Sequence, residues 1–222
     1  MMVRKILYVE GKGDIVFFQE LIRRIFEPKA LEIEVKEMGG KANLKRVLET
    51  GIKSLSLPCF GVALDLNTNT PSEFFGKVKS DLGSICGRPP EEIEEGIFKA
   101  GESFVHIIPI GLPEDERLKT LEIKRHSRED YLLKILLEDV KLTRNIPDFP
   151  MLLKKSIKFF AEKGIRAESS KDLLQLAKFI LHEDFEPGDK AFTTQVLSRA
   201  DLEVIKRATE DILIRLQKLG RS

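Results

Sequence analysis

Lys5-Ile-Leu-Tyr-Val-Glu-Gly-Lys-Gly-Asp14 is the stretch that decides the expected fold. Its apolar run ends at Val9 and predicts a short strand that is buried on both faces. Glu10 follows directly, and the spacing of apolar residues beyond it predicts a helix from Asp14 to Phe26, with Asp14 as its N-cap. Ligands of open α/β sheets bind beyond the carboxyl ends of the strands, so we expect Glu10 at the edge of a binding crevice.

Three further strand patterns follow, at Leu31–Glu37, Pro58–Leu66 and Phe104–Ile110, and helical patterns separate them. This alternation predicts an α/β fold with three layers, in which a four-stranded, mainly parallel sheet lies between helices. In residues 83–103 we expect a connection that contains one short helix. The predicted α/β domain is residues 1–112.

Beyond residue 112 the pattern becomes helical. We expect residues 113–222 to form a helical extension packed on the first domain. Its predicted helices are Glu129–Leu137, Met151–Lys163, Ser170–His182 and Ser198–Leu219.

Composition restricts the functions that the chain can have. The formal net charge is +1, so there is no overall basic field that would attract nucleic acid, and such a contact would need a local patch. No stretch is identified in which aromatic and basic residues alternate, so a stacking platform for single strands is not expected. The two cysteines and three histidines lack the spacing of a zinc site. The absence of a charged leader and of a long apolar segment makes a cytoplasmic location, without membrane contact, the expectation.

A second acidic residue follows a strand in the same way as Glu10. The third predicted strand ends in Asp65-Leu-Asn67. If the first and third strands are neighbours, Glu10, Asp65 and Asn67 meet at one sheet edge, where their oxygens suit a hard cation such as Mg²⁺ or Mn²⁺. The alternative is that these residues are polar strand ends in an inert domain.

These motifs resemble those of a known family. Glu10-Gly-Lys-Gly-Asp14 after an apolar strand, with Asp65-Leu-Asn67 after the third, is similar to the TOPRIM domain of topoisomerases, bacterial primases and overcoming-lysogenization-defect nucleases. The resemblance covers about the first half of the chain and is greatest to small stand-alone TOPRIM-like proteins. It implies that Glu10 acts as general acid or base in phosphodiester chemistry and that Asp65 and residue 67 hold magnesium. The family has a second aspartate where this chain has Asn67, so one negative charge is lost.

Further acids resemble the downstream acidic motif of the nuclease-type relatives. Glu122 and Asp130 are the candidate auxiliary acids in the second half, and Asp14 is a third one near Glu10. For Asp130 the alternative is a helix start capped by Ser127, with the carboxylate favouring the positive end of the helix. For Asp14 the alternative is a plain helix cap.

Three residues are candidate phosphate contacts. Gly11 and Lys12 lie at the start of the first helix, and Lys41 lies in a basic cluster at the start of the second helix. The alternative for both lysines is an ordinary solvated position. The sequence around Lys41 lacks the glycine spacing and the Ser or Thr of a P-loop.

Two functions from different classes agree with these observations. The first is a Mg²⁺-dependent, nuclease-like enzyme that acts on phosphodiesters. The second is a catalytically degraded TOPRIM-like module that binds a nucleotide, nucleic acid or a protein partner. A receiver-like domain is disfavoured because the fourth strand, Phe104–Ile110, ends without the required lysine.

Overall fold

The computed structural model describes residues 5–26 and 32–222, so Leu31 of the predicted second strand lies outside the described residues. By its contacts the chain divides into two units. Unit 1 is Met1–Ile110 with Asp211–Ser222, and unit 2 is Gly111–Glu210. The predicted division placed all of residues 113–222 in the helical region, whereas Asp211–Ser222 group with the sheet.

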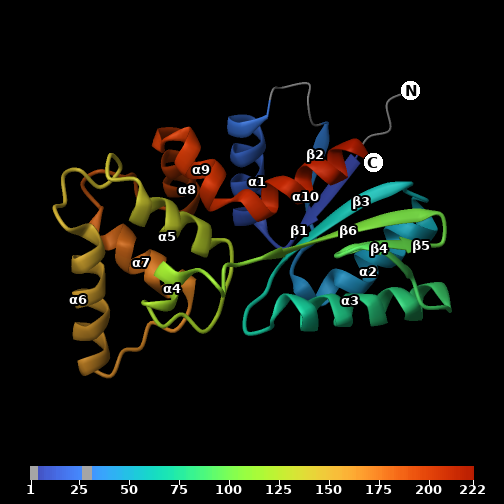
Figure 1. The fold of residues 1–222 in the computed structure, drawn as a ribbon, viewed down its shortest axis with the longest axis horizontal. Coiled ribbons are helices and arrows are strands. Elements are labelled where there is room, and N and C mark those ends of the chain that lie inside the picture. Colours follow the sequence, from blue (N-terminus) through green and yellow to red (C-terminus); the bar gives the residue numbers. More distant parts are fainter. Residues whose placement is uncertain (1–4, 27–31) are drawn as a thin grey trace. The chain divides into compact units, whose positions relative to one another are not determined.

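Unit 1 contains a mixed sheet with the strand order β2-β1-β3-β6-β5-β4 (Figure 1). The first four strands in this order are parallel to one another, β5 is antiparallel to β6, and β4 is antiparallel to β5. The strands are β1 (Lys5–Val9), β2 (Ile33–Glu37), β3 (Cys59–Asp65), β4 (Glu91–Glu94), β5 (Ile97–Ala100) and β6 (Ser103–Ile110). The four strands expected from the sequence are therefore present, and the expected adjacency of the first and third is confirmed.

The prediction of only four strands was wrong because residues 83–103 form more than a connection. They contain the hairpin β4–β5, which turns at Gly96 with φ +77° and adds two strands to the sheet. All four residues of β4 are exposed, and three of them are glutamates. A strand without an apolar face shows no alternation, so its sequence gives no strand signal.

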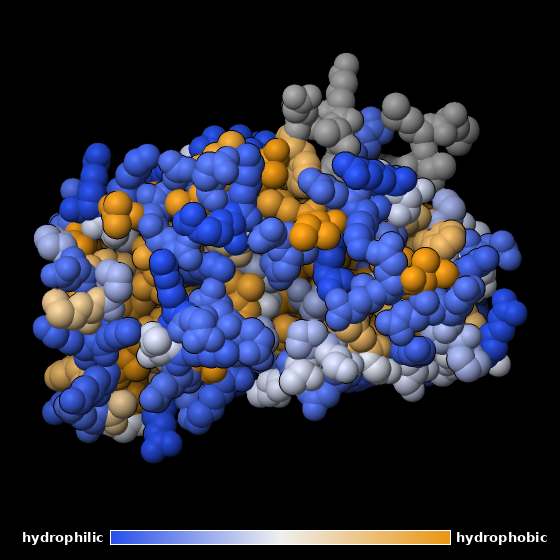
Figure 2. All heavy atoms as spheres, viewed as in Figure 1, coloured by the Kyte–Doolittle hydropathy of each residue, from blue (hydrophilic) through white to orange (hydrophobic). Residues whose placement is uncertain are grey.

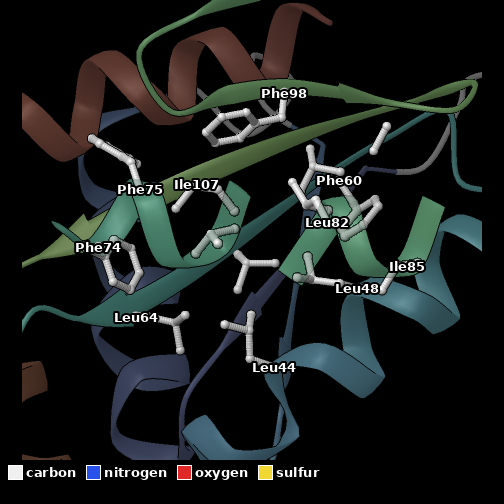
Figure 3. Close-up of a cluster of buried hydrophobic side chains, with 14 of the residues drawn as sticks. Leu44, Leu48, Phe60, Leu64, Phe74, Phe75, Leu82, Ile85, Phe98 and Ile107 are labelled. Atoms are coloured by element: carbon white, nitrogen blue, oxygen red, sulfur yellow. The ribbon is translucent and has the colours of Figure 1, made fainter. Parts of the chain in front are cut away.

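One face of the sheet is covered by α2 (Leu44–Glu49) and α3 (Pro71–Cys86). Phe60, Leu64 and Ile107 point from the sheet into a cluster with Leu44 and Phe74 of these helices (Figure 3). The α3 helix begins as predicted: the Thr70 hydroxyl accepts a hydrogen bond from the Glu73 N–H, and the Glu73 carboxylate accepts one from the Thr70 N–H. A 3₁₀ turn (Lys41–Asn43) precedes α2, and a π-helical turn (Thr50–Ser54) follows it.

The opposite face is covered by α1 (Lys12–Ile25) and α10 (Glu210–Arg221), as Figure 1 shows. Gly61 of β3 permits the close approach of α10, because a Cβ at this position would lie 2.7 Å from Leu219 Cδ2. The Lys5 ammonium donates to the Gly220 carbonyl oxygen at 2.5 Å. The last helix of the chain is thus an integral part of the α/β unit.

Unit 2 is helical, as expected. It contains α4 (Glu116–Lys119), α5 (Glu129–Glu138), α6 (Phe149–Glu162), α7 (Ser170–Ile180), α8 (Asp189–Arg199) and α9 (Leu202–Ala208). The expectation of a single helix over Ser198–Leu219 was wrong, because the helical structure is interrupted at the buried Thr209 between α9 and α10. In the described part of the chain, no helix has the length and apolar character needed to span a bilayer.

Candidate metal site

The edge formed by the carboxyl ends of β1 and β3 brings Glu10 and Asp65 to neighbouring positions. Val9 is in register with Ala63, so Glu10 follows the end of β1 beside the last residues of β3. No strand lies between the two. Both acids are half-buried. Each lies where its strand ends and the backbone continues into a turn.

Glu10 has the property expected of a cation ligand. Its Oε2 atom is buried and finds no hydrogen-bond partner among the described residues. A buried carboxylate oxygen without a partner is costly unless an opposite charge or a hydrogen-bond donor compensates for it. The Glu10 carbonyl oxygen, by contrast, accepts from the Gly40 N–H at 2.8 Å, which connects the turns after β1 and β2.

Asn67 lies in a tight turn directly after β3. Its backbone is in the left-handed region with φ +56°, which asparagine tolerates better than most residues. The side-chain Nδ2 donates to the Asp65 carbonyl oxygen at 3.2 Å. The amide oxygen of Asn67 therefore remains as the third oxygen of the predicted ligand set.

Lys41 is the cation that accompanies these acids. Its Nζ donates to the Asp65 carbonyl oxygen at 3.0 Å and lies 5.6 Å from the centre of the Phe74 ring. Burial lowers the pKa of the Lys41 ammonium and nearby Lys77 lowers it further, whereas the carboxylates of Glu10 and Asp65 act in the opposite direction. The side chains of Glu10, Asp65 and Lys41 thus interact electrostatically at one place.

Lys77 of α3 is a residue that sequence reasoning missed. Its positive charge lowers the pKa of Lys41 in addition to the larger effect of burial, so it is a second cation near Lys41. Its sequence position shows only that it lies on the exposed side of α3. Its nearness to Lys41 depends on how α3 packs on the sheet, which no local pattern reports.

The start of α1 uses its polar groups for capping. The helix begins at Lys12 with Gly11 as N-cap, so the prediction of Asp14 as N-cap was wrong by three residues. The Asp14 carboxylate instead accepts from the Gly11 N–H at 2.9 Å, which is one of the two bonds of a capping box; glycine has no side chain to form the other. This bond occupies the backbone donor of Gly11 that was predicted to contact phosphate, and Lys12 is exposed.

The other two predicted acids, Glu122 and Asp130, belong to unit 2. Glu122 is an exposed turn residue with φ +56°. Asp130 is fully buried in the first turn of α5, where its Oδ2 accepts from the Leu112 N–H at 2.7 Å and contacts His126 Nδ1 at 2.8 Å. Its Oδ1 is buried without a hydrogen-bond partner in the described residues. Asp130 therefore ties the start of α5 to the segment before it.

The oxygens at the sheet edge fit a magnesium ion better than a zinc ion. No cluster of three or more His, Cys, Asp or Glu side chains that could hold a metal occurs within residues 5–26 and 32–222. Magnesium, however, needs only one or two protein carboxylates, because water and substrate phosphate complete its coordination. Glu10, Asp65 and the amide oxygen of Asn67 provide such a set.

Comparison with known proteins relates this edge to a family. Residues 1–65 match an OLD-like TOPRIM domain. The family is described as the TOPRIM domain of overcoming lysogenization defect protein-like proteins. The resemblance predicted from the sequence motifs is confirmed for this segment. Glu10, Lys41 and Asp65 lie inside the TOPRIM match, and Asn67 lies two residues beyond it.

The chain is also similar to solved structures of the C-terminal region of the Xanthomonas campestris pv. campestris OLD protein. The structure phased with platinum has 14% identity and a TM-score of 0.48, with 98% of this chain and 94% of that chain covered. The structure phased with mercury has 14% identity and a TM-score of 0.48, with 100% and 98% covered. The comparison with curated proteins gives no match.

Proposed function

We propose that the protein is a Mg²⁺- or Mn²⁺-dependent, nuclease-like enzyme that acts on phosphodiesters of nucleic acid. The observation that supports this most is the buried, unpartnered carboxylate oxygen of Glu10 beside Asp65 in the segment that matches a TOPRIM domain. TOPRIM domains generally bind magnesium, which supports the choice of cation.

In this proposal each residue at the edge has a separate task. Asp65, Asn67 and Glu10 would hold the cation, which when bound polarises a phosphoryl oxygen and lowers the pKa of a water molecule. Glu10 would hold or accept the proton that moves during phosphodiester cleavage. The Lys41 ammonium, and secondarily Lys12, would attract the negatively charged phosphate.

A cleavage assay tests the enzymatic proposal. Purified protein is incubated with single- and double-stranded DNA and RNA, in Mg²⁺ or Mn²⁺. We expect cleavage that Glu10→Gln lowers about 100-fold or more, because general acid–base groups contribute roughly 10²–10⁴-fold. Glu37→Gln is the matched control, since Glu37 is an exposed acid at the end of the neighbouring strand β2. Cleavage that is equal in the wild type and in Glu10→Gln contradicts the proposal.

The second candidate function is a degraded TOPRIM-like module that binds nucleotide, nucleic acid or a protein partner. Asn67 favours it, because an amide in place of a carboxylate weakens the attraction for a divalent cation. In that case cleavage is absent with every substrate, and the substitution Asn67→Asp creates metal binding that the wild type lacks.

A further inference from the structure

The helix α6 exposes basic and aromatic side chains together. We define the α6 patch as Lys154, Lys155, Lys158, Phe159, Lys163 and Arg166, all of which are exposed. Phe159 has 56% of its surface exposed, which is unusual for a large aromatic residue. Residues 154–163 thus place Phe159 and Phe160 among four lysines, a combination that the sequence analysis did not single out.

The lysines of the α6 patch are not neutralised by neighbours, whereas Arg166 contributes, after Lys124, to lowering the pKa of the Glu168 carboxyl group. In the part of the chain that the structure describes, none of the five forms a salt bridge, whereas Lys124, Lys178 and Lys206 of the same unit each pair with an acid. Glu162 is an acidic residue on the same helix and pairs with none of them. The patch is thus a local excess of positive charge on a chain whose formal net charge is only +1.

The ring of Phe159 lies among these positively charged side chains. The Lys163 ammonium lies 5.9 Å from the ring centre, and the Phe160 ring meets it edge-on at 5.7 Å between centroids. An exposed aromatic ring beside an ammonium group combines the two contacts that single-stranded nucleic acid requires. Bases stack on aromatic rings, and phosphates bind cations.

The arrangement of α6 fits a single strand better than an anionic membrane. The side of the helix with Phe149 and Leu153 is buried within unit 2. On the exposed side, Lys155 lies by helical spacing between Met151 and Phe159, so the apolar residues are not segregated from the charged ones. Membrane-surface helices instead bury a continuous apolar face. Figure 2 shows hydrophobic and hydrophilic residues interspersed on the visible surface of the helical unit 2.

We propose that the α6 patch binds single-stranded nucleic acid, with a base stacked on Phe159 and phosphates bound by Lys155, Lys158 and Lys163. Insofar as it describes the substrate of the enzyme, this inference rests on the proposed function. It adds that the substrate is presented as a single strand and that unit 2 takes part in its binding.

Fluorescence anisotropy in EDTA tests this binding apart from any metal-dependent reaction. The probes are labelled 12-nucleotide oligo(dT), oligo(rU), the corresponding duplex and an abasic strand of equal length. We expect Phe159→Ala to weaken oligo(dT) or oligo(rU) binding by roughly 5- to 100-fold and to leave the abasic strand unaffected. The double substitution Lys155→Ser/Lys158→Ser lowers the slope of log K against log salt by about 1.4.

Two control variants carry the same kinds of substitution at residues outside the α6 patch. Phe179→Ala removes an aromatic residue of α7 that is 75% exposed, and Lys141→Ser/Lys206→Ser removes two lysines that have acidic partners. We expect both to bind like the wild type. Equal losses for Phe159→Ala and Phe179→Ala, tighter binding of the duplex, or binding to phosphatidylserine vesicles in place of the oligonucleotides overturns the proposal. Loss of cleavage in Glu10→Gln with unchanged anisotropy separates the proposed function from this one.

Discussion

His106 shows how burial can determine the charge of a single side chain. It lies on β6 with 3% of its surface exposed, and its Nε2 is 3.1 Å from the Ser222 hydroxyl. Burial lowers the pKa of His106 to about 4, the nearby Lys5 and Lys218 ammonium groups add to this, and the Glu94 carboxylate opposes it. The folded protein therefore favours the neutral imidazole.

We predict that this histidine makes unit 1 less stable in mild acid. Its pKa in the folded state is below the unfolded value of about 6.5, so its stabilisation is complete above pH 6.5 and is lost as the pH falls towards 4. Urea unfolding at a series of pH values should show that His106→Gln reduces this loss, by on the order of 1–3 kcal/mol. His182→Gln, at an exposed histidine, is the control; equal acid sensitivity of all three proteins contradicts the prediction.

The single residues of the site differ in how far the sequence predicts them. Glu10 and Asp65 follow apolar runs directly, so their position at strand ends is predictable from local pattern. Their adjacency needed only the additional assumption that β1 and β3 are neighbours, which the sheet order confirms. The roles of Asp14 and Lys77 were harder to predict from the sequence, because a cap position and a helix register depend on the structure around them.

The packing of α10 on the sheet depends on the absence of a side chain at Gly61. A Cβ there would lie 2.7 Å from Leu219 Cδ2 and 2.9 Å from Leu7 Cδ1, and both leucines are fully buried. We predict that Gly61→Ala lowers the free energy of unfolding by roughly 1–3 kcal/mol through overpacking. Denaturant unfolding measures this cost, and it should become smaller in a Leu219→Ala background, where the space is vacated.

Gly76 provides the matched control for this substitution. It lies within α3 at an exposed position, and a Cβ there would meet no atom within 4 Å. Gly76→Ala should therefore stabilise the protein by about 0.5–1 kcal/mol, since alanine favours a helix interior. An identical cost of Gly61→Ala with and without Leu219 would show that α10 does not pack as described.

Two elements were beyond prediction for definite physical reasons. The strand β4 exposes all its residues and has no alternation, so nothing in Glu91–Glu94 distinguishes it from a charged loop. An amphipathic helix such as α10 shows that one of its faces is buried, but it does not identify the surface that covers that face. The assignment of Asp211–Ser222 to unit 1 therefore required the structure.

At the level of the complete chain, the α/β character and the helical second half followed from the periodicity of apolar residues. The chain leaves unit 1 after β6 and returns to it in α10, so unit 2 is inserted between two parts of the α/β unit. The candidate metal site lies entirely in unit 1, and the α6 patch lies entirely in unit 2. Cation binding and strand binding can thus be measured separately by variants of different units.

Titration of the protein with Mn²⁺ by calorimetry is the most direct test that Glu10 and Asp65 together hold a divalent cation. We predict that the wild type binds, that Glu10→Gln and Asp65→Asn each weaken binding on the order of tenfold or more, and that Asn67→Asp strengthens it by adding a carboxylate. Glu37→Gln should bind as the wild type does. Absence of binding in the wild type, or binding in Glu10→Gln and Asp65→Asn that is as tight as in the wild type, would contradict the account.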